Sequence, residues 1–416
     1  MSSTFNELQQ EVLELLESSF DAGYDINSIK TISSGFAVFD LYTGGLPVGG
    51  PLVLIGTPGA GKSTLAQCLC AKLEQQYKSA FSVYVDNEFS LDEQRMKLLN
   101  IQHALVKVGL TLEEIDKLLD NVTEIKKAKN ITDPTLFVWD TYANTMTDKE
   151  MKLDDPTKAT GWKVRLLGHM LPKMIAKCIN HNIAFIIVNQ LRDVIAMDSY
   201  ITPAKELKYM PFGKDMPGGN PLKFNAFTLL YMKNLGKVQD AYGFSGSKVE
   251  FLTVKCKKRS DGAKFTMIFD HSTGFDDIWS ICEFLIQEKA IVPAGAYRRF
   301  KDYPEKSFHL KDFKKKYLED SEFRNIVTTV FNKHAEQILA KLGRSLIVDD
   351  NDMESAETIE QTTDTSNELE QLVDSVTSST TTSELIESNA TITETSESSN
   401  PESNDLASKN DSSVPF

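Results

Sequence analysis

The sequence predicts an α/β protein whose core is a doubly wound, mostly parallel β-sheet. Short runs of apolar and β-branched residues alternate with helical stretches between Ile32 and Asp270. The first four runs are almost continuously apolar, as strands buried on both faces must be. The last three runs follow one another closely, which favours an antiparallel extension of the same sheet. The runs are Leu52–Ile55, Phe81–Asp86, Leu136–Asp140, Ala184–Asn189, Phe227–Met232, Val249–Lys255 and Phe265–Phe269.

Segments of different composition flank this core, which is expected to span residues 32–272. Residues 1–31 begin with a capping-box pattern and apolar residues at helical spacing, so they predict an amphipathic helix and a linker. The apolar face of this helix packs either on its own domain or on an adjacent subunit. Residues 273–348 predict a small mixed C-terminal domain. Residues 349–416 are rich in Ser, Thr and Glu and are expected to form a disordered acidic tail.

The net charge is distributed unevenly along the chain. The 416 residues carry −14 in total, but residues 349–416 contain 17 acidic residues against Lys409 alone. Residues 1–348 therefore carry a net charge of +2, and nucleic acid is not excluded as their partner.

The five cysteines have no metal-ligand spacing, which is typical of a reducing compartment. No apolar run reaches the roughly 18 residues that a membrane span needs. The sequence therefore predicts a cytoplasmic protein without a membrane partner.

A phosphate-binding loop is the most specific local motif. Gly56-Thr57-Pro58-Gly59-Ala60-Gly61-Lys62-Ser63 follows an expected strand and precedes an expected helix that begins at Thr64, which is the context this motif requires. Its glycines let backbone N–H groups face phosphate oxygens at a helix N-terminus. Lys62 is expected to contact the β and γ phosphates, and Ser63 to ligate Mg²⁺. The loop, with Thr64 behind it, therefore predicts ATP and Mg²⁺ as ligands.

Two further strands end in carboxylates at the edge of the sheet where ligands gather. Asp140 ends the run that starts at Leu136, and it is placed to hold the water shell of Mg²⁺. Glu88 follows another strand end and is expected to orient and deprotonate the attacking water. The alternative for Glu88 is a solvated carboxylate at a strand end. Together with the phosphate loop, these residues predict ATP hydrolysis.

Two motifs frame a long loop in the second half of the core. Asn189-Gln190-Leu191-Arg192 precedes this loop, and Pro217-Gly218-Gly219-Asn220-Pro221-Leu222-Lys223-Phe224 closes it. With these motifs, with the lead-in at residues 32–47 and with Asp86-Asn87-Glu88, the chain resembles bacterial RecA and the phage UvsX-type recombinases. The resemblance covers residues 30–270 and implies a RecA-like P-loop ATPase core. The C-terminal region is similar to the phage type in placement and character.

The resemblance implies a role for each residue that matches a family motif. Glu88 falls at the catalytic glutamate, Asp140 at the Walker B aspartate, and Gln190 at the glutamine that senses the γ-phosphate. Asp92 matches the residue that contacts adenine. Arg95 stands where RecA has a stacking aromatic, and a guanidinium can also stack on a base.

The resemblance also implies that subunits act together. Lys255 and Lys257 match basic residues that reach the ATP of the neighbouring subunit, so hydrolysis is expected to require a filament. The implied partners are single-stranded DNA, homologous duplex DNA, other copies of the chain in a helical filament, a single-strand-binding protein and a mediator. The implied setting is the cytoplasm of a bacterial cell or of a phage-infected host.

Two loops, residues 145–163 and 191–217, are expected to face DNA. The second is too long for a plain connector, which typically has about 4–6 residues. Cations in such loops neutralise phosphates, and aromatic groups contact bases without reading sequence. A solvated surface loop is the alternative for each of them. The residues expected to contact DNA are Lys158, Lys163, Arg192, Lys205, Lys208, Tyr209, Phe212, Lys214, Gly218, Gly219 and Asn220.

The sequence thus predicts an ATP-dependent recombinase that forms filaments on single-stranded DNA and catalyses strand exchange. A hexameric RecA-fold DNA helicase and an ATP-binding regulator of recombination are the alternatives, although Lys62 and Glu88 together argue against the regulator. In residues 273–348 basic residues are interleaved with aromatic ones, which fits either contact with duplex DNA or a solvated charged surface.

Overall fold

The computed structural model describes residues 29–153, 161–193, 207–238 and 242–343. The chain divides into two units, Met1–Ser345 and Leu346–Phe416, and all described residues belong to the first. The predicted N-terminal helix and the predicted acidic tail lie outside the described residues. So do Lys158 and Lys205.

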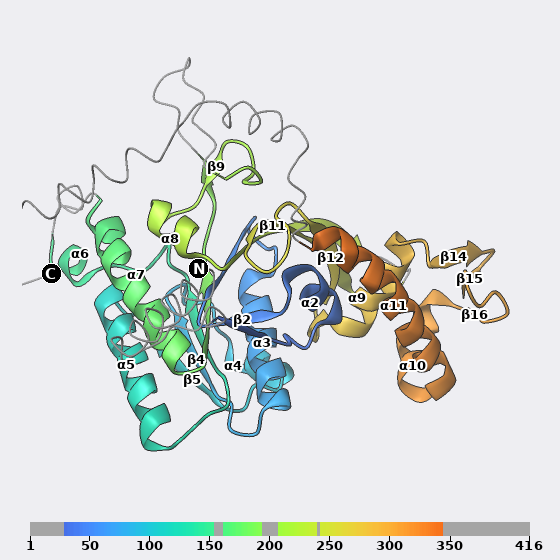
Figure 1. Cartoon of the computed structure of the whole chain (residues 1–416), viewed down its shortest axis with the longest axis horizontal. Coiled ribbons are helices and arrows are strands. Elements are labelled where there is room, and N and C mark those ends of the chain that lie inside the picture. Colours follow the sequence, from blue (N-terminus) through green and yellow to red (C-terminus); the bar gives the residue numbers. More distant parts are fainter. Residues whose placement is uncertain (1–28, 154–160, 194–206, 239–241, 344–416) are drawn as a thin grey trace, which may run out of the picture. The chain divides into compact units, whose positions relative to one another are not determined.

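A nine-stranded mixed sheet forms the centre of the first unit (Figure 1). In spatial order its strands are β13 (Gly274–Asp276), β12 (Lys264–Asp270), β11 (Gly246–Cys256), β10 (Thr228–Val238), β3 (Pro51–Gly56), β7 (Ile183–Val188), β6 (Thr135–Asp140), β4 (Ser82–Asp86) and β5 (Ala104–Val108). All neighbours from β10 to β5 are parallel, and all from β10 to β13 are antiparallel. The predicted parallel core with an antiparallel extension is therefore confirmed.

Helices cover both faces of this sheet (Figure 1). Residues of β3 alternate between two hydrophobic clusters, with Leu52 and Leu54 on one face and Val53 and Ile55 on the other. Successive side chains of a strand point to opposite faces, so a doubly covered strand must be apolar throughout. One face packs on α2 (Ala37–Thr43), α3 (Lys62–Gln76) and α9 (Asp277–Gln287), and the other on α5 (Leu112–Ala128), α7 (Trp162–Asn180) and α8 (Gly219–Asn225).

Shorter elements complete the described part of the chain. Two small ribbons pair β1 (Lys30–Ile32) with β2 (Leu46–Val48), and β8 (Arg192–Asp193) with β9 (Lys214–Asp215). The remaining helices of the core are α4 (Glu93–Leu98) and α6 (Asp148–Met151). The C-terminal region contains β14 (Ile291–Ala294), β15 (Tyr297–Phe300), β16 (Ser307–Phe308), η2 (Leu310–Asp312), α10 (Phe313–Glu319) and α11 (Ser321–Leu342).

The sequence pattern does not predict β5 or β13. β5 is the last strand of the sheet, and its Leu105 and Val108 are 46% and 51% exposed. A strand at an edge needs no apolar run, because one side of it faces solvent. β13 has three residues, too few for a periodic pattern.

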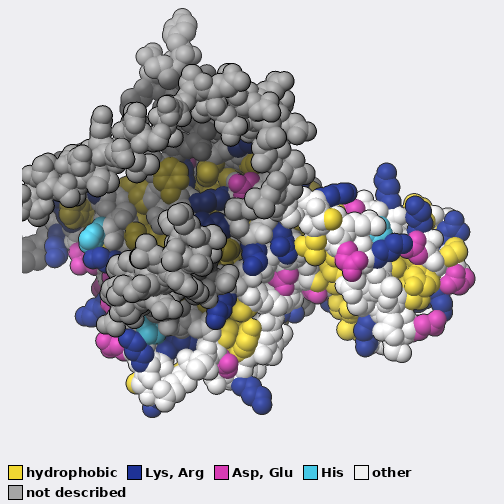
Figure 2. All heavy atoms as spheres, in the orientation of Figure 1, with side chains coloured by type: hydrophobic (Ala, Val, Ile, Leu, Met, Phe, Trp, Pro, Cys, Tyr) yellow, Lys and Arg dark blue, Asp and Glu magenta, His cyan; other side chains and the backbone are white. Residues whose placement is uncertain are grey.

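Aromatic side chains form the core of the C-terminal region. Phe300, Phe308, Phe313 and Phe323 are all buried, and each ring contacts at least two of the others. The basic residues of this region lie among acidic ones, as Figure 2 shows, and Lys306, Lys314 and Lys333 form ion pairs. None of the helices in the described ranges is long and apolar enough to cross a membrane.

Candidate functional site

The phosphate loop turns from β3 into α3 at the carboxyl edge of the parallel strands. Gly61 has a φ of +85°, a left-handed conformation that glycine adopts without strain. The Lys62 ammonium lies 3.4 Å and 3.2 Å from the carbonyl oxygens of Gly56 and Thr57. Burial lowers the pKa of Lys62, and the nearby carboxylates of Glu88 and Asp140 oppose this shift. Lys62, Glu88 and Asp140, which were predicted from separate motifs, thus lie close together at this edge of the sheet.

Asp140 lies beside this loop with one carboxylate oxygen unsatisfied. Its side chain is fully buried, and Oδ2 accepts a hydrogen bond of 2.6 Å from the Tyr84 hydroxyl. Oδ1 has no partner among the described residues. Burial raises the pKa of Asp140 to about 6, and the nearby Tyr84 and Ser63 hydroxyls oppose this rise. A buried, unpaired carboxylate oxygen beside Ser63 fits a divalent cation and its water shell.

Glu88 is exposed and sits on a loop that Asp86 holds in place. The Asp86 carboxylate accepts hydrogen bonds from the backbone N–H groups of Glu88, Ser90 and Leu91 at 3.0, 3.0 and 2.8 Å. Asp86 itself is paired with Asp140 in the register of β4 and β6. The backbone carrying Glu88 is therefore fixed at the same edge as Asp140.

Asn87 and Thr145 join the two strand ends, and the sequence analysis assigned them no role. The Asn87 side chain donates to Thr145 Oγ1 at 2.8 Å, and its backbone N–H donates to the Asp140 carbonyl at 2.5 Å. The Trp139 indole also donates to Thr145 Oγ1, at 2.7 Å. Since Thr145 begins the first predicted DNA loop, these bonds connect that loop to the nucleotide site. The position of Asn87 directly before Glu88, within the Asp86-Asn87-Glu88 motif, was the available signal.

Arg95 lies on the other side of the loop, where a nucleotide base is expected. Its guanidinium donates to Thr64 Oγ1 at 2.9 Å and lies 6.0 Å from the ring centre of Phe269. The Asp92 carboxylate caps α4 by accepting from the Gln94 N–H at 3.0 Å. Phe269 was not predicted as a site residue, because it lies far from the loop in sequence. The base contacts of Asp92 and Arg95 remain predictions.

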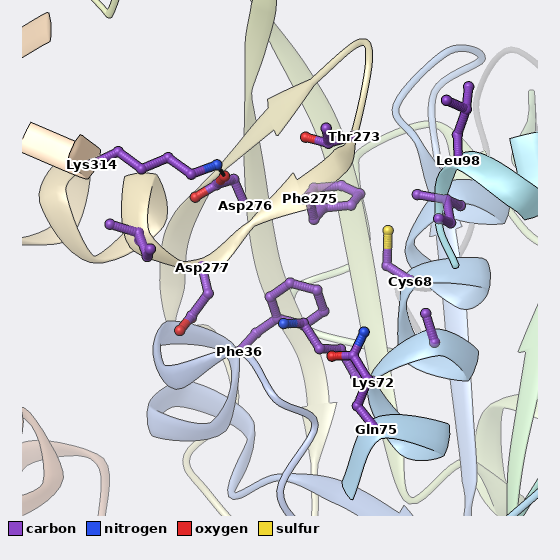
Figure 3. A pocket seen from close by; sticks show the side chains of 13 residues that line it. Phe36, Cys68, Lys72, Gln75, Leu98, Thr273, Phe275, Asp276, Asp277 and Lys314 are labelled. Atoms are coloured by element: carbon purple, nitrogen blue, oxygen red, sulfur yellow. Dashed lines mark hydrogen bonds and ion pairs between the residues drawn. The ribbon is translucent and has the colours of Figure 1, made fainter. Parts of the chain in front are cut away.

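A pocket of about 290 Å³ lies beside α3 (Figure 3). Lys72 of α3 lines it, opposite Phe275 and Asp276 of β13. Lys314 of α10 reaches into it and forms an ion pair with Asp276. The Phe275 ring lies 3.3 Å from the position that a Cβ on Gly61 would take. The pocket thus adjoins the phosphate loop but is lined by other residues.

Gln190 follows the end of β7 at the same edge of the sheet. Its backbone N–H donates to Asn189 Oδ1 at 2.9 Å, and Asn189 Nδ2 donates to the Pro217 carbonyl at 2.7 Å. One buried amide therefore joins both ends of the second loop. Gly218, with a φ of +103°, starts α8, and a Cβ there would lie 3.0 Å from the Tyr142 ring.

The described residues predicted to contact DNA cluster around the ends of the two loops. Arg192 is exposed, and Phe212 is 84% exposed. Lys214 forms an ion pair of 2.6 Å with Asp193, and the Lys208 ammonium lies 5.4 Å from the ring centre of Tyr209. Gly219 and Asn220 lie in the first turn of α8.

Lys163 is half-buried, unlike a surface cation. Its ammonium donates to the Tyr142 carbonyl at 2.8 Å and lies 4.3 Å from the centre of the Tyr142 ring. Burial lowers the pKa of Lys163 to about 8; Glu150 raises it and Arg192 lowers it. Lys163 therefore positions the start of α7, and its contact with DNA remains a prediction.

Lys255 and Lys257 lie at the opposite, amino edge of the parallel strands. Lys255 pairs with Leu229 near the start of β10, and its ammonium donates to the carbonyls of Lys223 and Phe224 at 3.1 and 2.6 Å. The Lys257 ammonium lies 5.9 Å from the ring centre of Phe227. The structure does not bring either lysine to the phosphate loop of the same chain.

The site has the groups that ATP with Mg²⁺ requires. The loop supplies backbone N–H groups and Lys62 for the phosphates, and Ser63 and Asp140 Oδ1 are available to the cation. The described residues hold no cluster of three or more His, Cys, Asp or Glu side chains that could ligate a metal ion. Fold and site together define a P-loop ATPase of the α/β class.

The chain belongs to the RecA family. Its residues 16–273 match the family model described as RecA N-terminal domain. The family places the chain among RecA-like recombinases, which act in DNA recombination and repair.

Curated relatives agree with this assignment. The chain is 26% identical over 276 residues to Protein RecA of Wolbachia sp. subsp. Brugia malayi, which covers 65% of this chain and 72% of that protein. It is 25% identical over 283 residues to Protein RecA of Helicobacter pylori, covering 67% and 76%. DNA repair protein recA homolog 3, mitochondrial, of Arabidopsis thaliana is 24% identical over 353 residues, covering 82% and 75%.

Proposed function

We propose that this chain hydrolyses ATP with Mg²⁺, polymerises into helical filaments on single-stranded DNA and catalyses homologous pairing and strand exchange. One observation carries the proposal. The buried Asn189 amide joins the end of β7, next to Gln190, to Pro217 at the far end of the second loop. A single strand end is thus shared by the nucleotide site and by the segment expected to hold DNA.

The proposed hydrolysis uses residues that converge at the carboxyl edge. Lys62 neutralises charge on the β and γ phosphates, and Ser63 and Asp140 hold Mg²⁺. Glu88 accepts a proton from the water that attacks the γ-phosphorus while the bond to the leaving ADP oxygen breaks. The bonds from Asp86 to the Glu88 loop support this role, because they fix the backbone that carries the base.

The proposed coupling to DNA runs through β7. Gln190 follows this strand and directly precedes the loop that α8 closes. A change in the position of Gln190 on loss of the γ-phosphate would move Asn189 and, through its hydrogen bond, Pro217. The DNA loop would then change with the nucleotide.

Self-association is supported by two separate features, the lysines at the end of β11 and the β5 edge. Lys255 and Lys257 lie away from the phosphate loop of their own chain, as residues that act on a neighbour must. The β5 edge leaves Leu105 and Val108 about half exposed, beside Phe89, which is 74% exposed. Exposed apolar residues on an unpaired strand edge are typical of a surface that another chain covers.

The finer assignments belong to the same proposal. The chain is divided into an N-terminal element (residues 1–31), an ATPase core (32–272), a C-terminal domain (273–348) and a tail (349–416). It is like the phage recombinases, and it works with a single-strand-binding protein and a mediator. The RecA family assignment supports the core of this scheme, and the basic and aromatic C-terminal region supports contact with duplex DNA.

Electron microscopy with single-stranded DNA and a slowly hydrolysed ATP analogue tests the proposal. We expect open helical filaments and an ATPase that needs single-stranded DNA. Lys62→Ala should lower hydrolysis by at least about a hundredfold, and Lys127→Ala, an exposed lysine on α5, should leave it unchanged. Closed hexameric rings that unwind forked DNA would instead identify a helicase. Full ATPase activity in a DNA-free monomer would overturn the proposal.

A further inference from the structure

Trp162 differs in exposure from the other two tryptophans of this chain. Trp139 is fully buried and Trp279 is 3% exposed, whereas Trp162 is 37% exposed. An indole that served the hydrophobic core would be buried as the other two are. Trp162 occupies the first position of α7, directly after Gly161.

Trp162 lies where the described ends of both predicted DNA loops meet. Since α7 leads into the start of the parallel strand β7, its first turn lies at the carboxyl edge of the sheet. Val164, two residues on, is 3.4 Å from the position that a Cβ on Gly219 would take. Lys163 is close enough to Arg192 for the two charges to affect one another. Trp162 therefore ends the first loop on the same helical turn whose next residues lie near Gly219 and Arg192 of the second.

A cation lies against the indole face. The Lys149 ammonium, from α6, is 4.5 Å from the ring centre of Trp162, and Lys149 is exposed. This geometry is a cation–π contact, which orients the ring without burying it. An exposed aromatic ring with a cation beside it matches the two chemical parts of a nucleotide, the flat base and the phosphate.

We propose that Trp162 is a stacking platform for a base of single-stranded DNA and that Lys149 neutralises the adjacent phosphate. This inference rests on the proposed function and adds to it a base contact at the end of the first loop. The base stacks on the indole, and the ammonium moves from the ring to the phosphate. Such stacking is sequence-tolerant, because every base has a flat face.

The intrinsic fluorescence of the full-length protein tests the platform directly. A base stacked on Trp162 quenches its emission, and the buried Trp139 and Trp279 are shielded from that contact. We expect saturable quenching on addition of oligothymidylate with a non-hydrolysed ATP analogue, and none in Trp162→Phe. Quenching that persists in Trp162→Phe, or that appears with the analogue alone, would show a different origin and overturn the inference.

Fluorescence anisotropy of a labelled oligonucleotide separates this inference from the function on which it rests. Binding without quenching of the wild type removes the platform and leaves the recombinase proposal intact. If the protein does not bind single-stranded DNA at all, both the stacking platform and the recombinase proposal are wrong. With binding and quenching, Trp162→Ala should weaken affinity about tenfold, and Trp162→Phe, which retains a flat ring, should weaken it less.

Lys149→Met provides an independent measurement on the same site. The logarithm of the DNA association constant falls linearly with the logarithm of the salt concentration. Removal of one phosphate contact on single-stranded DNA should make this slope less steep by about 0.7. Trp162→Ala should leave that slope unchanged, because stacking releases no counterion. Equal slopes in wild type and Lys149→Met would remove the role given to the ammonium. Circular dichroism of each variant verifies the fold.

Discussion

The buried charge of Asp140 suits cation binding but lowers the stability of the nucleotide-free protein. Its carboxylate is buried with one oxygen unpaired, and burial raises its pKa to about 6. A raised carboxyl pKa means that the folded state binds the proton more tightly than the unfolded state does. Above pH 6 the ionised Asp140 therefore destabilises the nucleotide-free protein, whereas a bound cation would use that charge.

Asp140→Asn should stabilise the nucleotide-free protein at pH 8 and abolish Mg²⁺-dependent hydrolysis. A shift of about 2 pKa units corresponds to about 3 kcal/mol in the free energy of unfolding. This advantage should shrink as the pH falls through 6 and vanish below about pH 4, where Asp140 is protonated in both states. Thermal unfolding of both proteins between pH 4 and 8, without Mg²⁺, measures it. A variant less stable than wild type at pH 8 would contradict the prediction.

The convergence of Lys62, Glu88 and Asp140 was predictable because it follows from local motifs and parallel topology. Lys62, Glu88 and Asp140 each end or follow a strand, and the carboxyl ends of parallel strands meet at one edge. The contact of Arg95 with Thr64 and Phe269 was not predictable in this way. Phe269 lies on the antiparallel extension, whose register no local pattern gives.

At the scale of elements, the buried side chain of Asn189 joins the residue after β7 to Pro217, which lies just before α8. Asn189 accepts from the N–H of Gln190 and donates to the carbonyl of Pro217. Leaving such buried backbone groups without a partner costs about 1–3 kcal/mol. The closure of the second loop therefore depends on this amide.

Asn189→Ala should uncouple the ATPase from DNA. If the substitution weakens the closure of the second loop by about 1.4 kcal/mol, the stimulation of ATP hydrolysis by single-stranded DNA should fall about tenfold. The affinity for ATP should change little. ATPase rates with and without DNA, and binding of a fluorescent ATP analogue, measure the two effects. Asn225→Ala is the matched control, since Asn225 Nδ2 makes a similar bond of 2.8 Å to Pro221, but within α8. If both variants lost DNA stimulation equally, the cause would be a less stable α8 and not the bond from Asn189 to Pro217.

At the scale of the whole molecule, one subunit cannot complete the proposed site. Lys255 lies at the amino edge of the strands and the phosphate loop at the carboxyl edge. A head-to-tail arrangement of copies brings such opposite edges together, and it generates a helical filament when it does not close.

A mixing experiment tests whether Lys255 acts on a neighbouring subunit. Lys255→Met and Lys62→Ala should each be inactive alone, since one lacks the neighbour's cation and the other the phosphate contact. In an equal mixture, about one interface in four joins an intact loop to an intact Lys255, so about a quarter of wild-type hydrolysis should return. A mixture as inactive as its components would show that Lys255 acts within its own chain.

The acidic tail offers a second prediction at this scale. Residues 349–416 carry 17 acidic residues against one lysine, while the remainder of the chain has a net charge of +2. A tethered polyanion competes with DNA for cations, so deletion of residues 349–416 should tighten DNA binding severalfold and flatten its salt dependence. Titrations at several salt concentrations measure both. Unchanged affinity after truncation would exclude this competition.

The sequence by itself determined the parallel core, the phosphate loop and the carboxylates at the ends of β4 and β6. These features depend on periodicity and short motifs, which are local properties of the chain. Only the tertiary structure decided that the Lys163 ammonium bonds the Tyr142 carbonyl, that Lys255 lies at the edge opposite the phosphate loop, and that Trp162 is exposed at the start of α7. Each of these depends on which distant segments pack together, and burial and long-range register are not encoded in the spacing of nearby residues.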